Sequence, residues 1–145
     1  MAEALLAEKG AGKFEVASAG IRAAARVNPL AIEALANIGI SWEGRSPRTV
    51  DGLARKEWDY VITVCDNAKE SCPILPGHPV AAHWGMEDPT DVTGTHEEQL
   101  RAFTRGRDLL ARRIDLMVAL PFAKLPRLAI ENRLRAIPTE VPADS

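Results

Sequence analysis

The sequence predicts an α/β fold in which an open parallel sheet is flanked by helices. Apolar, β-branched runs at residues 59–65 and 80–84 are typical of buried strands. Helical patterns precede and follow these runs, above all the long amphipathic segment His96–Val118. Strands that alternate with helices favour parallel pairing, because each crossover returns the chain to the same end of the sheet.

Two of the expected helices have clear start or stop signals. Ala2–Lys9 is rich in Ala, Leu and Glu, and Gly10 follows it as a terminator. Asn28 and Pro29 suit the N-cap and first position of a second helix that Gly39 would end. The residues expected on its buried face are Ala31, Leu35 and Ile38.

The longest expected helix, His96–Val118, opens with a capping box formed by Thr95 and Glu98. Gly106 inside it costs about 1 kcal/mol relative to alanine, so packing must stabilise this helix. The expected apolar stripe comprises Leu100, Phe103, Leu110, Ile114 and Met117. Its arginines are expected to form mainly a solvated face, with a weaker hypothesis that one binds an anion: Arg101, Arg105, Arg107, Arg112 and Arg113.

The remaining segments are shorter. Residues 13–17 suit a strand and residues 50–57 a short helix. Pro121 is expected to close the main domain, residues 1–120. Residues 121–145 then form a C-terminal appendage with one weak helix at 128–137.

Composition limits the classes of function. The chain has 145 residues, of which 46% are hydrophobic and 26% charged, as in a soluble domain with a real core. A net charge of -2 gives no reason to expect nucleic acid or a membrane as partner. There is no signal-peptide pattern and no apolar run of membrane-spanning length, so we expect a cytoplasmic protein.

The two cysteines are the most informative residues. Cys65 falls at the carboxyl end of the first strand and Cys72 follows seven positions later. In the cytoplasm such a pair is more typical of redox or metal chemistry than of a static disulfide, yet two buried, inert thiols explain the spacing equally well. Zinc binding by this pair with His78 and His83 is disfavoured, because the spacing matches no usual zinc pattern.

Asp88 is the candidate general acid or base. It precedes a proline in a loop, where an aspartate more often simply forms a turn. Glu87 and Asp91 flank it and could exchange roles with it. No Cys-x5-Arg loop, which would cradle an oxyanion on backbone N–H groups, is present, because Ser71 and His78 stand six positions after the two cysteines.

Six motifs together resemble a known family: MAEALL, FEVASAG, VNPLAIEALANIGI, DYVITVCDNAKESCPILPG, HW and EDP, in this order over roughly residues 1–120. They are similar to thioredoxin-coupled arsenate reductases, which share the low-molecular-weight tyrosine phosphatase fold. The resemblance implies reduction of arsenate to arsenite by a cysteine relay, with thioredoxin as external reductant and no bound cofactor or metal.

The resemblance also implies roles for individual residues. Cys65 corresponds to the second thiol of the relay and Cys72 to the third, and these two form the disulfide that thioredoxin reduces. Asp88 corresponds to the acid that protonates the leaving oxygen. Glu3 and Ser18 correspond, more weakly, to residues that support the nucleophile loop or a nearby cation.

One departure from the family lies at the nucleophile. In the family a strand and the Cys-x5-Arg loop precede MAEALL, whereas this sequence starts at that methionine. We therefore expect the N-terminal strand to be missing, strand edges to be exposed, the fold to be marginal and the printed chain to be inactive. A phosphatase of the same fold and a non-enzymatic fragment that binds arsenite through its thiols stay open as alternatives.

Overall fold

The computed structural model describes residues 1–19, 28–42, 57–64 and 77–143. The expected helix at residues 50–57 falls almost wholly outside these ranges. In chain order, the described elements are α1 (Ala2–Lys9), α2 (Pro29–Ala36), β1 (Tyr60–Thr63), β2 (Val80–His83), the 3-10 turn η1 (Pro89–Asp91), α5 (His96–Val118), η2 (Phe122–Lys124) and α6 (Arg127–Glu140).

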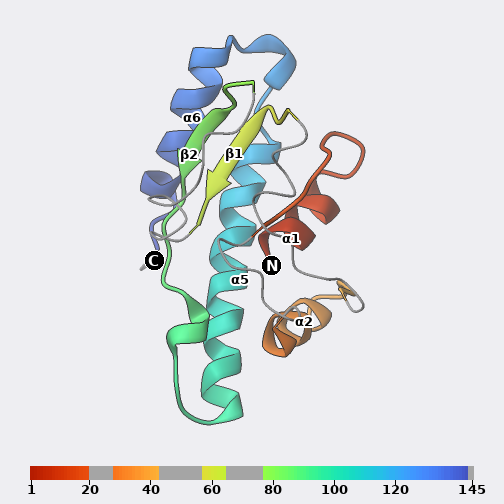
Figure 1. The fold of residues 1–145 in the computed structure, drawn as a ribbon, viewed down its shortest axis with the longest axis vertical. Coiled ribbons are helices and arrows are strands. Elements are labelled where there is room, and N and C mark those ends of the chain that lie inside the picture. Colours follow the sequence, from red (N-terminus) through yellow and green to blue (C-terminus); the bar gives the residue numbers. More distant parts are fainter. Residues whose placement is uncertain (20–27, 43–56, 65–76, 144–145) are drawn as a thin grey trace.

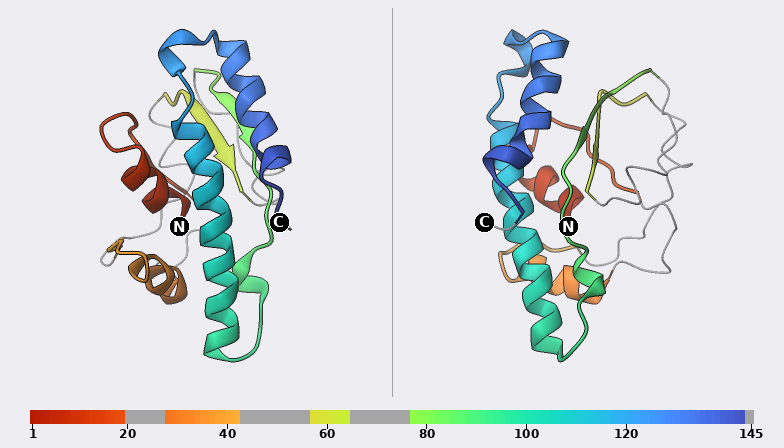
Figure 2. Two further views of the ribbon diagram at one scale, coloured as in Figure 1. Left: turned by 180° about the vertical axis from the view of Figure 1, so that it is seen from behind. Right: turned by 90° about the vertical axis from the view of Figure 1, so that its left-hand side faces the viewer.

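The two described strands pair in parallel, as the alternation of strands and helices predicts. Tyr60 lies opposite Val80, and the register runs on to Thr63 opposite His83. Along β2 the buried side chains alternate with more exposed ones, as expected for a strand with one face on a core. Figure 2 shows that α5 and α6 lie together against one face of this sheet.

The long helix α5 has the bounds that the sequence predicts. The Thr95 hydroxyl accepts a hydrogen bond of 3.2 Å from the Glu98 backbone N–H, so the N-cap forms as expected. Four of the five residues of its expected apolar stripe are buried and the fifth, Leu100, is half-buried. Helices α1 and α2 lie along the same helix (Figure 1), so α5 joins the sheet to the N-terminal helices.

The second helix also begins as predicted, but its buried face differs. Asn28 Oδ1 accepts a 2.9 Å hydrogen bond from the Leu30 N–H, and Gly39 adopts the expected left-handed conformation with φ +82°. The expectation that Ile38 is buried is wrong, because the helix ends at Ala36 and Ile38 is 46% exposed in the following turn. Ala34 is buried in its place.

The predicted strand at residues 13–17 is also wrong. Lys13 closes a turn with Gly10, and residues 14–19 have no regular secondary structure. A strand requires a ladder of hydrogen bonds to a neighbour, and within the described residues the only such ladder joins β1 to β2. The apolar alternation of this segment instead places Phe14 against the ring of Phe122.

Helix α6 is longer than the predicted 128–137 segment and shares the main core. Ile130, Leu134 and Ile137 are buried in one cluster with Trp84 of the β2 end and Ile114 of α5. The division of the chain at residue 120 stays a prediction. The packing nevertheless makes α6 part of the same hydrophobic core as the sheet.

Polar contacts from α6 also cover the outer edge of β2. In a parallel pair, alternate residues direct both backbone groups toward the neighbouring strand, so those of Ala81 point away from β1. The Ala81 carbonyl accepts a 3.1 Å hydrogen bond from Arg135 Nε, and the His78 carbonyl accepts one from Arg127. A basic helix across a strand edge blocks further strand pairing there.

We predict that Leu134→Ala lowers the free energy of unfolding by about 2–5 kcal/mol, because Leu134 is 0% exposed and its truncation leaves a cavity. The matched control is Leu128→Ala on the same helix, where the side chain is 67% exposed and a change within about 0.5 kcal/mol is expected. Urea unfolding followed by circular dichroism measures both. Equal losses in the two variants would show that α6 is not packed as described.

Three aromatic rings join η2 to the start of the sheet. The Phe122 ring lies 5.4 Å from that of Phe14 and 5.3 Å from that of Tyr60, measured between ring centroids. Partial burial in this cluster, with the nearby Asp59 carboxylate, raises the pKa of Tyr60 above its ordinary value of 10.0, against a smaller opposing effect of Arg127.

Tyr60 is the single tyrosine of the chain, so its titration is directly visible in the ultraviolet absorbance of tyrosinate. We predict a midpoint above 10.0 in the folded protein and a return toward 10.0 in concentrated urea. The stability linked to this group is therefore present below pH 10 and lost as pH rises through the folded pKa. Arg127→Gln should move the folded midpoint further upward, and a folded midpoint at or below 10.0 would contradict the described cluster.

Candidate active site

Both chemistry-bearing segments leave the sheet at the same edge. Strand β1 ends at Thr63, two residues before Cys65, and β2 ends at His83, five residues before Asp88. Because β1 and β2 are parallel, both segments emerge at the carboxyl edge, where open α/β sheets bind ligands. Cys65 and Cys72 themselves lie outside the described residues.

At this edge the last residues of the two strands contact each other. Thr63 Oγ1 and His83 Nδ1 are 2.7 Å apart, and the two residues face each other in the strand register. The ladder extends one step beyond the strands, since the Trp84 N–H donates to the Thr63 carbonyl at 2.7 Å. Side-chain and backbone hydrogen bonds therefore join the end of β1 to the end of β2 at this edge.

Asp88 is exposed and has an ordered carboxylate. Its Oδ1 accepts hydrogen bonds from the Thr90 backbone N–H at 2.9 Å and the Thr90 hydroxyl at 2.7 Å, so Asp88 is the side-chain N-cap of η1. Among the residues that the structure describes, none bonds to Oδ2. The turn-forming role expected for this aspartate is therefore present, and it uses one of the two carboxylate oxygens.

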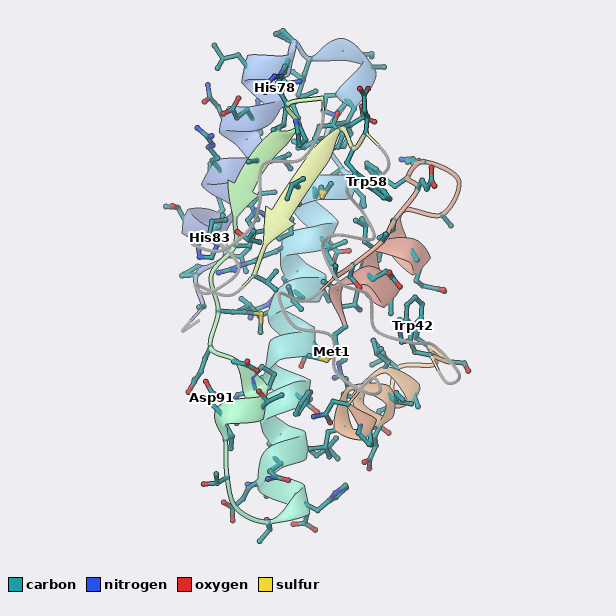
Figure 3. All side chains as sticks on the ribbon, in the orientation of Figure 1. Met1, Trp42, Trp58, His78, His83 and Asp91 are labelled. Atoms are coloured by element: carbon teal, nitrogen blue, oxygen red, sulfur yellow. The ribbon has the colours of Figure 1, made fainter. Side chains whose placement is uncertain are left out.

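The neighbouring acids are placed differently. Glu87 precedes the cap and lines a surface cavity, and Asp91 is exposed at the end of η1 (Figure 3). Of these three acidic side chains, Asp88 alone caps the turn. Within this segment the Asp88 carboxylate is therefore the one oriented by the backbone of the turn, and its role as the acid stays a prediction.

The cavity beside Glu87 has a volume of about 290 Å³ and lies between the η1 segment and α5. Two basic and two acidic side chains line it, together with apolar groups: Glu87, Arg105, Asp108 and Arg112, with Met86, Pro89, Val92, Ala102, Gly106, Leu109 and Ala143. Because the charges balance, this cavity does not favour the anion-binding role considered for the helix arginines.

Three of those arginines, Arg101, Arg105 and Arg112, are exposed as expected, whereas the other two are buried. Arg107 is 8% exposed; its Nη1 donates to the Ala34 carbonyl of α2 at 2.7 Å, and its Nη2 pairs with Asp108 at 2.9 Å. Arg113 is 1% exposed. The helical period carries the signal that was missed, because positions 107 and 113 fall beside the apolar stripe residues 103, 110, 114 and 117.

Arg113 is bonded to three carbonyl groups. Its Nη1 donates to Trp84 at 3.0 Å and Gly85 at 3.2 Å, and its Nε donates to Val141 at 2.9 Å. Burial, and secondarily the neighbouring Arg112, lowers the pKa of Arg113. This buried cation thus holds the backbone that leads from β2 toward Asp88.

Gly106 explains how the segment around Asp88 approaches α5 so closely. A Cβ at this position would lie 2.8 Å from Met86 Cε and 3.9 Å from Pro89 Cγ. From the sequence, Gly106 is only an unfavourable residue inside a helix. The structure shows that its missing side chain leaves room for the residues on either side of Asp88.

Glu3 and Ser18, the two residues assigned more weakly from the resemblance, are in contact in the structure. Ser18 donates to Glu3 Oε1 from its backbone N–H at 2.7 Å and from its hydroxyl at 3.3 Å. Glu3 lies in the first turn of α1, so this contact fixes residues 14–19 against that helix.

The two histidines weighed for a zinc site lie at opposite ends of β2 (Figure 3). His78, with φ +49°, precedes the strand by two residues, and His83 is the last residue of the strand. In the described ranges no three His, Cys, Asp or Glu residues gather in a metal-binding arrangement. Nor does any described helix have the length and apolar character needed to cross a bilayer.

The described strands form a parallel sheet with α5 and α6 on one face and an acidic turn after β2 at its carboxyl edge, an arrangement of the α/β class. The family model described as "Low molecular weight phosphotyrosine protein phosphatase" matches residues 1–127. Similar curated proteins include arsenate reductases. That of Halalkalibacterium halodurans is 38% identical over 70% of this chain and 73% of its own length, and that of Bacillus subtilis is 34% identical over 79% and 81%.

Solved structures agree with these relatives. A structure titled "An arsenate reductase in oxidized state" superposes with a TM-score of 0.68 at 26% identity, covering 81% of this chain and 85% of the other. A reduced-state arsenate reductase gives a TM-score of 0.61 at 27% identity. The chain therefore belongs to the low molecular weight phosphotyrosine protein phosphatase family, within its arsenate reductase branch. The fold predicted from the sequence is confirmed.

Proposed function

We propose that this chain acts in the reduction of arsenate to arsenite, through a relay that ends as a Cys65–Cys72 disulfide reduced by thioredoxin. The observation that carries the proposal is the match to arsenate reductases over 73–81% of the length of the two relatives described above. The shared carboxyl edge supports it, because the segments that contain Cys65 and Asp88 both emerge there. A cytoplasmic role in arsenic detoxification would follow from this activity.

The proposed chemistry balances as a two-electron reduction. A first thiolate, from a Cys-x5-Arg loop, forms a sulfur–arsenic bond while Asp88 protonates the oxygen that leaves as water. Cys65 then attacks that sulfur, and arsenite leaves with the electron pair of the broken bond. Cys72 attacks Cys65 in turn, which releases the first thiol and leaves the Cys65–Cys72 disulfide. The thioredoxin dithiol supplies the two electrons that reopen it.

The printed sequence contains the second and third thiols but no Cys-x5-Arg sequence. We propose that the 145 residues alone supply the relay and the acid but not the nucleophile. The phosphatase alternative is compatible with Asp88, but a phosphatase needs no relay thiols, and the curated relatives described above are arsenate reductases.

We predict that the 145-residue chain reduces arsenate no faster than the reaction without enzyme. A version extended before Met1 by a strand and a Cys-x5-Arg loop should be active. Arsenate-dependent oxidation of NADPH, coupled through thioredoxin and thioredoxin reductase, measures both proteins. Activity in the printed chain that requires Cys65 or Cys72 would mean that one of them attacks the oxyanion directly.

The controls for that assay are Cys65→Ser and Cys72→Ser in the extended version. Each should abolish turnover, because the relay cannot close its disulfide without both thiols. Hydrolysis of para-nitrophenyl phosphate is measured in parallel. If both serine variants keep full arsenate reduction, the relay is wrong, and if only phosphate ester is hydrolysed, the phosphatase alternative holds.

We predict that Asp88→Asn in the extended version lowers kcat for arsenate by about 10²–10⁴-fold, the usual contribution of a general acid. Asp91→Asn is the matched control, because this neighbouring carboxylate is exposed at the far end of η1 and should change kcat less than about twofold. If the two variants behave alike, Asp88 is not the acid.

A further inference from the structure

The buried guanidinium of Arg113 joins three parts of the chain. It projects from α5, and its carbonyl partners are Trp84 and Gly85, directly after β2, and Val141, directly after α6. In Figure 1 the end of β2 and the C-terminal end of α6 lie side by side against α5. Within the described residues, Arg113 has carbonyl partners but no carboxylate partner.

The residues held by Arg113 lead directly to the acid. Gly85 precedes Asp88 by three positions, and between them the Met86 N–H donates to the Val64 carbonyl at 3.2 Å. Beyond Asp88, the Thr90 turn and the approach of Pro89 to Gly106 fix the other side. The acid therefore sits on a short segment that is anchored at both ends.

We propose that Arg113 is a positioning residue for Asp88 and that α6 contributes to this positioning through the Val141 carbonyl. The inference rests on the proposed role of Asp88 as general acid. The family model matches residues 1–127, whereas Val141 lies beyond them. Helix α6 thus adds a support for the acid-bearing segment that the matched region does not contain.

The chemistry of the side chain explains why an arginine is used. A guanidinium presents five N–H donors in a rigid planar fork, so one residue can serve carbonyls on two different segments at once. A lysine ammonium at the same place is a point charge on a flexible stem and cannot span the same partners with fixed geometry. Replacement by methionine keeps much of the volume and removes every donor.

Hydrogen–deuterium exchange on the 145-residue chain tests the anchoring directly. In Arg113→Met we expect amide exchange in residues 84–92 and around residue 141 to become about tenfold faster, because local opening is no longer opposed by these hydrogen bonds. Arg113→Lys, which keeps the charge, should show a smaller increase of about threefold and serves if the methionine variant does not fold.

The matched control is Arg107→Met, since Arg107 is the other buried arginine of α5 and binds α2 rather than the β2 end. It should speed exchange in residues 29–36 and leave residues 84–92 unchanged. Unchanged exchange at 84–92 in both Arg113 variants would overturn the proposal. Faster exchange at residues 84–92 in Arg107→Met would also overturn the proposal, because it would reveal a general loosening of α5.

Kinetics in the extended, active version test whether the anchoring acts through Asp88. Arg113→Met should lower kcat about tenfold with KM unchanged, and should cost less than about twofold when Asp88→Asn is already present. Equal losses in both backgrounds would show a general structural effect and overturn the proposal.

The two proposals fail in different ways. If the extended protein does not reduce arsenate, or if Asp88→Asn is fully active, the proposed function is wrong. The exchange experiment on the printed chain still shows whether Arg113 holds residues 84–92.

Discussion

The apolar face of α5 is the constraint on which the rest of this structure depends. Two parallel strands of four residues each cannot hold together by their own hydrogen bonds, and an isolated pair of strands is marginal in water. Burial of Val80, Ala82 and Trp84 against Ile114 and Met117 of α5 provides the apolar contact that the short ladder lacks. Helices α1, α2 and α6 also pack along α5. The position of each of these helices relative to the sheet therefore depends on where α5 lies.

This dependence explains why α6 is integrated so thoroughly. The indole N–H of Trp84 donates to the Leu134 carbonyl at 2.9 Å, inside the core, while Arg135 binds the exposed edge of β2. One helix therefore satisfies a buried donor at the end of the strand and covers the backbone at its outer edge. Both contacts remove costs that the short ladder between the two described strands would otherwise carry.

The features set by local chemistry could be predicted from the sequence. Caps at Asn28 and Thr95, the bounds of α5 and the parallel pairing all follow from side-chain types at fixed spacing. Tertiary packing decided the rest. A strand pattern at residues 13–17 has no ladder partner in the described chain, and Gly106 is explained only by the Met86 side chain that approaches it. Of the candidate site, the sequence indicated the sheet edge, whereas the roles of Asp88, Cys65 and Cys72 stay predictions.

Charged residues on an amphipathic helix show why such predictions stop where they do. Arg107 and Arg113 are charged residues of a type that usually lies on the surface, whereas their helical positions place them beside the apolar stripe of α5. Their guanidinium groups donate to backbone carbonyls near the end of α2, directly after β2 and directly after α6. Burial of a guanidinium is tolerated because its N–H groups donate hydrogen bonds to several carbonyls at once. The Arg113 guanidinium therefore links the backbone that leads from β2 toward the exposed Asp88 with α5 and with the residue that follows α6.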